Sequence, residues 1–225
     1  VAPHQLTLTA TPIPRTLSMS VYANMDVSVI DELPPGRKPI QTSCLPLSGK
    51  DKLIERIFAA TKQGSKVYWI CPLIEESENL DLNAVMETYE ELSEHFSQDK
   101  VGCLHGKLSA NKKQEQIQAF KDSKTSILVS TTVVEVGVDI PDADIMVIEN
   151  AERFGLAQLH QLRGRIGRGT KESFCILLHK DKIQDISSQR LHVLVDSQDG
   201  FKIAEEDLVI RLSLIHISEP TRQWQ

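Results

Sequence analysis

Residues 127–130 read Ile-Leu-Val-Ser, and residues 145–148 read Ile-Met-Val-Ile. Both are short apolar runs rich in branched side chains. They lack the alternation of apolar and polar residues that marks a strand with one face in water. Such runs are typical of parallel strands that are buried on both faces. The two segments therefore predict the interior of a parallel β-sheet.

Similar runs recur along the chain, and segments of helical periodicity separate them. Further strands are expected at residues 6–8, 40–45, 67–71, 101–104 and 174–178. Strands that alternate with helices predict an α/β fold, with a mostly parallel sheet covered by helices on both faces.

Two of the intervening segments have clear helical patterns. Over residues 82–96, apolar side chains recur every three or four positions and form one stripe. Ser109 is expected to cap a second helix over residues 110–121, in which Ile117 and Phe120 would face the core.

Composition is that of an ordinary globular protein, with 40% hydrophobic and 25% charged residues among 225. No stretch reaches the ~20 apolar residues that span a membrane. The first ten residues also lack the pattern of a signal peptide, so we expect a cytoplasmic protein with no membrane partner. The net charge of −6 argues mildly against nucleic acid as a partner, although local clusters of Lys and Arg matter more. A soluble acidic metabolic enzyme stays open as an alternative.

The four cysteines are widely spaced, at Cys44, Cys71, Cys103 and Cys175. No Cys-x-x-Cys pair occurs, and no histidine lies at ligand spacing from a second His or Cys. We therefore expect buried free thiols and assign no structural metal.

The strongest chemical signal lies at residues 158–168, Gln-Leu-His-Gln-Leu-Arg-Gly-Arg-Ile-Gly-Arg. Three arginines, Arg163, Arg165 and Arg168, alternate there with two glycines. A guanidinium group matches phosphate oxygens, and glycine lets the backbone approach a ligand closely. In phosphoryl transfer, an arginine directed at the γ-phosphate stabilises the charge of the transition state. The pattern indicates an anion site, with a solvated basic loop as the structural alternative.

A second anion site is indicated where the strand at residues 127–129 runs into Ser130, Thr131 and Thr132. Residues 133–141 follow as Val-Val-Glu-Val-Gly-Val-Asp-Ile-Pro. Hydroxyl and amide groups at the carboxyl end of a parallel strand, beside a helix N-terminus, suit an anionic backbone. A simple strand-to-helix turn is the alternative.

Together these segments resemble the conserved motifs of superfamily 2 helicases. Residues 161–168 fit the Q-x-x-G-R-x-G-R pattern of motif VI, and residues 127–141 are similar to motif V. Residues 67–72, Val-Tyr-Trp-Ile-Cys-Pro, resemble motif IV, and Thr-Ala-Thr-Pro at residues 9–12 resembles motif III. The resemblance implies a RecA-like helicase domain of the P-loop NTPase fold.

Two stretches point to one branch of this superfamily. Residues 71–77, Cys-Pro-Leu-Ile-Glu-Glu-Ser, and residues 31–37, Asp-Glu-Leu-Pro-Pro-Gly-Arg, are similar to RecG helicases. The transcription-repair coupling translocase Mfd differs at both places. The resemblance to RecG covers residues ~5–211, nearly the whole chain, and its motifs are specific.

The resemblance assigns roles to individual residues. Two arginines would be catalytic, acting on ATP bound to the other motor domain: Arg165 and Arg168. Three residues would contact the nucleotide, the last of them coupling it to DNA: Gly137, Asp139 and Gln161. Six residues would contact DNA phosphates: Ser130, Thr131, Thr132, His105, Gly106 and Lys107. For His105 a purely structural role is the alternative. Three residues of motif III would link hydrolysis to DNA movement: Thr9, Ala10 and Thr11.

The resemblance also implies a division of the chain. Residues 1–31 would end a first motor domain, residues 32–37 would form a hinge, and residues 38–180 would form the second motor domain. Residues 181–211 would begin the helical translocation element. Residues 212–225 depart from the family, which would continue Gly-x-Gly-Glu, and we interpret them as a reading-frame or assembly artefact.

The function implied is that of an ATP-dependent DNA helicase acting on branched DNA, by regressing replication forks or migrating Holliday junctions. No G-x-x-x-x-G-K-[ST] loop occurs in the sequence, so ATP and Mg²⁺ would be bound mainly by a missing first motor domain. A DNA-binding domain would be missing too. We expect the isolated fragment to be an inactive monomer. The alternatives are an Mfd-like fragment acting on stalled RNA polymerase and a non-catalytic nucleic-acid-binding module.

Overall fold

A computed structural model describes residues 6, 8, 28, 30, 36, 38–72, 78–97, 100–131, 143–167 and 171–218. Within α-helices at residues 78–81 and 213–218 it describes the backbone alone. Most of the expected first-domain segment and hinge, residues 1–37, therefore lies outside the description, and that division of the chain stays a prediction.

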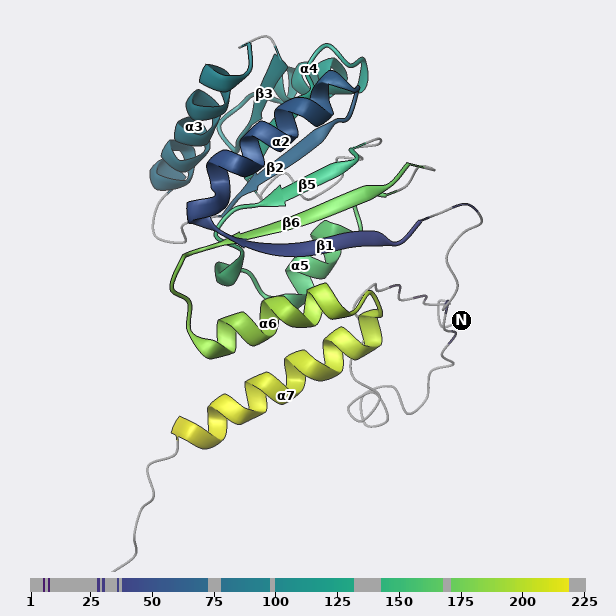
Figure 1. The fold of residues 1–225 in the computed structure, drawn as a ribbon, viewed down its shortest axis with the longest axis vertical. Coiled ribbons are helices and arrows are strands. Elements are labelled where there is room, and N and C mark those ends of the chain that lie inside the picture. The colour runs from purple at the N-terminus through teal and green to yellow at the C-terminus, as the bar shows by residue number, and fades with distance from the viewer. Residues whose placement is uncertain are drawn as a thin grey trace, which may run out of the picture.

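Six parallel strands form one sheet in the order β1-β6-β5-β2-β4-β3 (Figure 1). They are β1 (Ile40–Pro46), β2 (Val67–Cys71), β3 (Val101–Leu104), β4 (Ile127–Thr131), β5 (Ile145–Ile148) and β6 (Ser173–His179). In the centre, Trp69 of β2 lies opposite Val129 and Val147. Because the strands are parallel, their carboxyl ends all meet one edge of the sheet.

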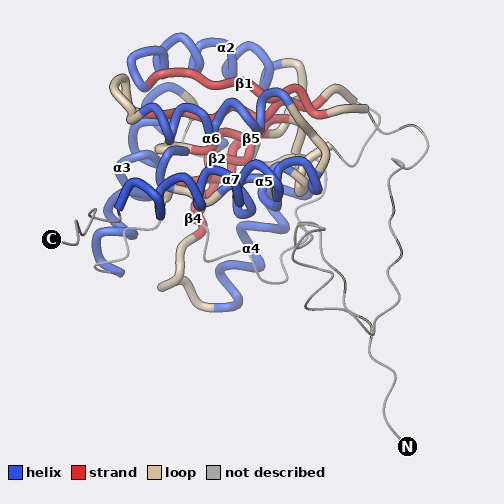
Figure 2. Tube along the Cα trace, turned by 90° about the horizontal axis from the view of Figure 1, so that it is seen from below, coloured by secondary structure: helices blue, strands red, loops and turns tan. Residues whose placement is uncertain are grey.

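Helices cover both faces of this sheet, as Figures 1 and 2 show. The helices α2 (Lys50–Lys62) and α3 (Glu78–His95) lie on one face. The other face carries α4 (Ala110–Lys121), α5 (Leu156–Arg163) and α6 (Asp185–Asp196). A last helix, α7 (Gly200–Ser218), packs on α5 and α6. Short 3-10 helices, η1 (Leu47–Gly49) and η4 (Ala151–Arg153), follow β1 and β5. The predicted α/β class is confirmed.

Alternate side chains of β2 supply two hydrophobic cores, one on each face of the sheet. Val67, Trp69 and Cys71 pack under α2 and α3, whereas Tyr68 and Ile70 pack under the helices of the other face. Every residue of β2 is buried. Burial on both faces explains why the central strands read as continuous apolar runs.

Most element boundaries agree with the sequence-based expectations. The strands at 67–71, 101–104 and 145–148 are confirmed without change. Those expected at 40–45, 127–130 and 174–178 are each longer by one or two residues. The helix α4 begins after the expected cap, where Ser109 Oγ accepts a hydrogen bond from Lys112 N at 3.4 Å.

The two described residues of the strand expected at residues 6–8 do not form a strand. Leu6 and Leu8 belong to no regular secondary structure, and each is 82% exposed. A three-residue strand is stable only when a neighbouring strand satisfies its backbone groups. None of the six described strands pairs with this segment.

All four cysteines are free, as predicted, with Cys71 and Cys175 buried and Cys44 and Cys103 half-buried. Burial raises the pKa of the Cys71 and Cys175 thiols to about 12 and that of the Cys44 and Cys103 thiols to about 11. These side chains therefore act as small packing groups. In the part of the chain that is described, no helix is long and apolar enough to cross a membrane.

Phe120 tests the core on the α4 face, and Phe174 of β6 serves as the control. Phe120 is fully buried, whereas Phe174 is 37% exposed. We expect Phe120→Ala to lower the free energy of unfolding by about 3–5 kcal/mol, because the lost burial leaves a cavity. Phe174→Ala is expected to lower it by no more than about 1 kcal/mol. Chemical denaturation measures both, and equal losses would contradict the placement of α4 over the sheet.

Candidate functional site

Two of the predicted phosphate-binding groups come together at the carboxyl edge of the sheet. β4 ends with Ser130 and Thr131, and the turn formed by residues 105–107 follows β3 directly. These two strands are paired in parallel, with Leu104 opposite Ser130. Residues that are far apart in the sequence thus lie side by side at one edge of the sheet.

The two hydroxyl groups at the end of β4 differ in what they contact. Ser130 is fully buried, and its Oγ donates a hydrogen bond to the Thr131 carbonyl oxygen at 2.9 Å. Thr131 is also buried, but its Oγ1 has no hydrogen-bond partner among the described residues. A buried hydroxyl without a partner is costly. Thr131 is therefore better suited than Ser130 to bind an oxygen of a ligand.

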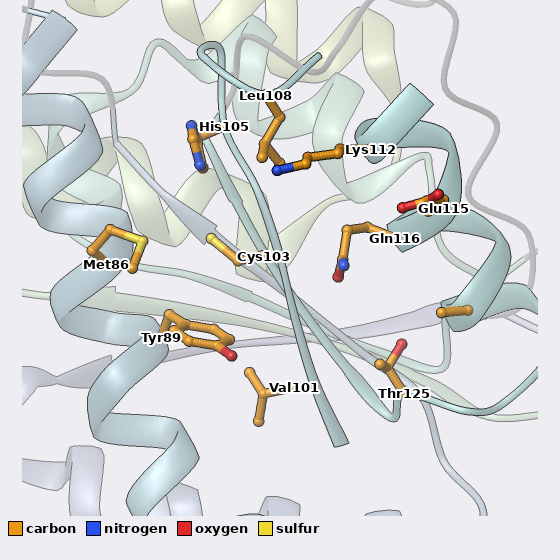
Figure 3. Close-up of a pocket in the computed structure, with 11 residues that line it drawn as sticks. Met86, Tyr89, Val101, Cys103, His105, Leu108, Lys112, Glu115, Gln116 and Thr125 are labelled. Atoms are coloured by element: carbon orange, nitrogen blue, oxygen red, sulfur yellow. The ribbon is translucent and has the colours of Figure 1, made fainter. Parts of the chain in front are cut away.

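His105 lies beside a cavity of about 490 Å³ between α3 and α4, and Figure 3 shows its ring at one end of this cavity, near Leu108 and Lys112. Its Nδ1 is buried and has no hydrogen-bond partner within the part of the chain that the structure describes. Burial lowers the pKa of His105, and the nearby cations Lys113 and Lys107 lower it further. The imidazole is therefore mainly neutral at pH 7. Lysines, rather than His105, supply the positive charge at this turn.

Lys113 is a member of this turn that the sequence reasoning missed. Its Nζ donates a hydrogen bond to the Gly106 carbonyl oxygen at 3.1 Å. The residue lies in the first turn of α4, and no acidic residue is present in that turn. Lys113 thus holds the turn in place and adds a second cation beside Lys107. The only sequence feature that could have indicated this contact is the spacing of seven residues between Gly106 and Lys113, on either side of the expected start of α4.

The motif VI segment begins in α5 and continues into the turn that follows it. The Gly164 amide donates to the His160 carbonyl at 3.0 Å, and the Arg165 amide donates to the Leu162 carbonyl at 2.9 Å. Gln161 is exposed on α5, and Arg165 is half-buried. The backbone that carries both residues is thus hydrogen-bonded through α5 and the turn after it.

Arg163 differs from Arg165, which is half-buried, because its guanidinium group is buried, with 3% of the residue exposed. Its Nη1 donates to the carbonyl oxygens of Leu194 at 2.6 Å and Ser197 at 2.9 Å. These carbonyls end α6, where main-chain acceptors lack partners within the helix. Its Nη2 lies 3.1 Å from His160 Nδ1. Burial lowers the pKa of Arg163. Arg163 therefore links α5 to α6.

Gly167 closes the segment against the sheet in a conformation that favours glycine. Its φ angle is +71°, and a Cβ atom there would lie 3.0 Å from Ile40 Cγ1. The second glycine of the motif is thus required twice, by the backbone and by the packing on β1.

The other predicted site residues lie outside the described part of the chain and stay predictions. They are Thr9, Ala10, Thr11, Thr132, Gly137, Asp139 and Arg168.

Comparison with known proteins agrees with this arrangement. The model of the helicase conserved C-terminal domain matches residues 49–170. The chain belongs to this family. RecG of Pasteurella multocida and RecG of Escherichia coli K12, both ATP-dependent DNA helicases, are each 52% identical to it over 210 residues. That alignment covers 93% of this chain and 30% of each relative. The chain thus spans less than a third of their length.

Solved structures give the same result. RecG bound to a three-way DNA junction superposes with a TM-score of 0.72 at 45% identity, over 88% of this chain and 26% of that one. The DUF1998 helicase MrfA bound to DNA shares the fold, with a TM-score of 0.54 at 16% identity over 77% of this chain and 24% of that one. The resemblance to RecG and the RecA-like helicase fold are confirmed.

The link from α5 to α6 can be tested with Arg163→Met. We expect it to lower the free energy of unfolding by about 2–4 kcal/mol, because two buried carbonyl oxygens lose their donor. Arg56→Met, at an exposed position of α2, is the matched control and should have little effect. Urea denaturation measures both, and an Arg163→Met protein as stable as the control would refute the link.

The requirement for Gly167 can be tested against Gly64, which has a φ of +85° but nothing within 4 Å of an added Cβ. Gly64→Ala should cost about 1–2 kcal/mol, from the left-handed backbone alone. Gly167→Ala should cost about 2–4 kcal/mol, because contact with Ile40 adds to the backbone strain. Thermal unfolding with a known enthalpy gives both values. Equal costs would argue against close packing at Gly167.

Proposed function

We propose that this chain supplies the second motor domain of a RecG-type ATP-dependent helicase, which remodels branched DNA by regressing forks or migrating Holliday junctions. One observation carries the proposal: the fold superposes with a TM-score of 0.72 on RecG bound to a three-way DNA junction. The 45% identity between the two chains extends this likeness from the backbone to the side chains.

The nucleotide side of the proposal rests on α5 and the turn after it. Arg165 and Arg168 would stabilise the charge on the γ-phosphate of ATP held by a first motor domain. Gln161, Gly137 and Asp139 would contact the nucleotide. A catalytic arginine is effective only when its support is rigid. The packing of α5 against α7 and its link to α6 through Arg163 give that support.

The groups assigned to ATP on this chain are mainly donors to phosphate. No three His, Cys, Asp or Glu side chains cluster as metal ligands among the described residues. In this proposal ATP and Mg²⁺ are held mainly by the first motor domain, and this chain contributes the arginines that complete the site. Thr9, Ala10 and Thr11 would link hydrolysis to movement along DNA.

The DNA side of the proposal rests on the carboxyl edge of β3 and β4. Lys107 and Lys113 provide cations at the turn after β3. His105, Gly106, Ser130 and Thr132 would complete the contacts to phosphates. Thr131 would join them through its Oγ1, for which no described residue is a hydrogen-bond partner. Phosphate contacts of this kind are independent of sequence, as branched DNA recognition requires.

The proposal can be tested in a hybrid protein that joins residues 38–211 to the DNA-binding and first motor domains of Escherichia coli RecG. We expect forked DNA to stimulate its ATP hydrolysis. Arg165→Ala and Arg168→Ala should each lower kcat by ~10²–10³-fold, because each removes charge stabilisation from the transition state. Steady-state ATPase assays with a forked substrate measure the effect.

Arg56→Ala, on the exposed face of α2, is the control and should leave kcat unchanged. The 225-residue chain alone should show no DNA-stimulated hydrolysis. A hybrid that binds ATP but is not stimulated by DNA would favour a non-catalytic module. Normal activity in both arginine variants would refute the assigned catalytic role.

A further inference from the structure

A group of polar side chains is buried where β2 and β5 end, apart from the residues assigned above. Glu149 follows β5 directly and is 9% exposed. Its Oε1 accepts a hydrogen bond from Lys50 Nζ at 2.8 Å, and its Oε2 accepts one from Trp69 Nε1 at 3.0 Å. Thr88 Oγ1 lies 3.2 Å from the same Oε2. One carboxylate thus contacts α2, β2 and α3.

Lys50 holds this carboxylate as a charged partner. Its Nζ also lies 2.6 Å from Glu91 Oε2, and its side chain is only 14% exposed. Burial alone would lower the pKa of Lys50, but the carboxylates of Glu149 and Glu91 outweigh burial and raise it. Lys50 therefore stays protonated. A buried ion pair adds little net stability, but breaking it leaves an uncompensated charge, so it constrains geometry strongly.

Glu149 lies where the chain leaves two neighbouring strands toward opposite faces of the sheet. β2 leads into α3 on one face, whereas the neighbouring β5 leads through η4 into α5 on the other face. In open α/β sheets, ligands commonly bind at such a reversal. Here the Glu149 side chain lies at this reversal and binds other residues of the chain. Its backbone amide donates to the Ile70 carbonyl at 2.8 Å. Asn150 follows in a left-handed conformation, with a φ of +49°.

We propose that Glu149 is a positioning residue that fixes the turn leading into α5 to α2 and α3 on the opposite face of the sheet. The functional meaning rests on the proposed function, because α5 carries Gln161 and leads to Arg165. α3 follows the end of β2, on the edge that is proposed to face DNA. A displacement of α3 would therefore pass through Glu149 to the segment that is proposed to act on ATP.

Glu149→Gln and Glu91→Gln form a matched pair for the test. Each removes one carboxylate charge that faces Lys50, but Glu149 belongs to the turn after β5, whereas Glu91 belongs to α3. The measurements are amide hydrogen exchange and the indole N–H resonance of Trp69 in the 225-residue chain. The other indole, Trp224, is assigned with Trp224→Phe.

In Glu149→Gln, we expect the Trp69 resonance to shift and exchange at residues 149–163 to rise by about tenfold or more, with β1 and α6 unchanged. Glu91→Gln should leave both signals near those of the unchanged protein. Equal effects of the two variants, or a uniform rise across the fold, would overturn the proposal. If Glu149→Gln does not fold, Lys50→Met decides, because it should produce the same local rise at residues 149–163.

These measurements need neither ATP nor DNA, so their outcome is independent of the proposed function. A second set with forked DNA separates the two. We expect DNA to protect the turn formed by residues 105–107 in all three proteins. Protection should extend to residues 149–163 in the unchanged protein and in Glu91→Gln, but not in Glu149→Gln. Absence of any protection by DNA would count against the proposed function, while the first measurements would still decide the role of Glu149.

Discussion

Burial of β2 on both faces is the constraint on which the rest of this structure depends. A strand enclosed in this way must be apolar on both faces, and any polar atom it carries needs a partner inside the protein. Trp69 is fully buried but has an indole N–H, and Glu149 accepts its hydrogen bond. A buried carboxylate in turn needs a cation, which Lys50 supplies. The central strand thus determines which polar groups lie at the edge of the sheet.

The helices on the α5 face form a continuation of the core. Ile203 and Ile210 of α7 are buried in the same hydrophobic cluster as the strand residues of that face. Polar links reinforce the packing, since Arg163 bonds the end of α6, and Arg190 of α6 donates to the Phe154 carbonyl at 3.1 Å. α5 packs between the sheet on one side and α6 and α7 on the other. A displacement of either layer would therefore move the turn that follows α5.

Local patterns made the strands and the α4 cap predictable from sequence, because burial on two faces and a serine cap leave their mark within a few residues. The strand expected at residues 6–8 shows the limit, since a short apolar run says nothing about whether a neighbour exists to pair with it. The network around Glu149 could not be predicted either. Its partner Lys50 lies 99 residues away, and both are residue types normally assigned to the surface. The motif identified the family, but it did not show that Arg163 has a structural role. That role depends on hydrogen bonds to the end of α6, more than 30 residues further along the chain.

The net charge of the chain and the distribution of its charged side chains likewise lead to different expectations. A net charge of −6 argued mildly against a nucleic-acid partner. In the structure, part of the negative charge lies on α3, which carries Glu87, Glu90, Glu91 and Glu94. On the opposite face, α4 carries Lys112, Lys113 and Lys121, and Lys107 precedes it at the edge where phosphates are expected. Since fields at a surface follow the nearest charges and are screened within ~10 Å, the α4 turn can be cationic in an acidic protein. The total charge is therefore no argument against the proposed DNA contact.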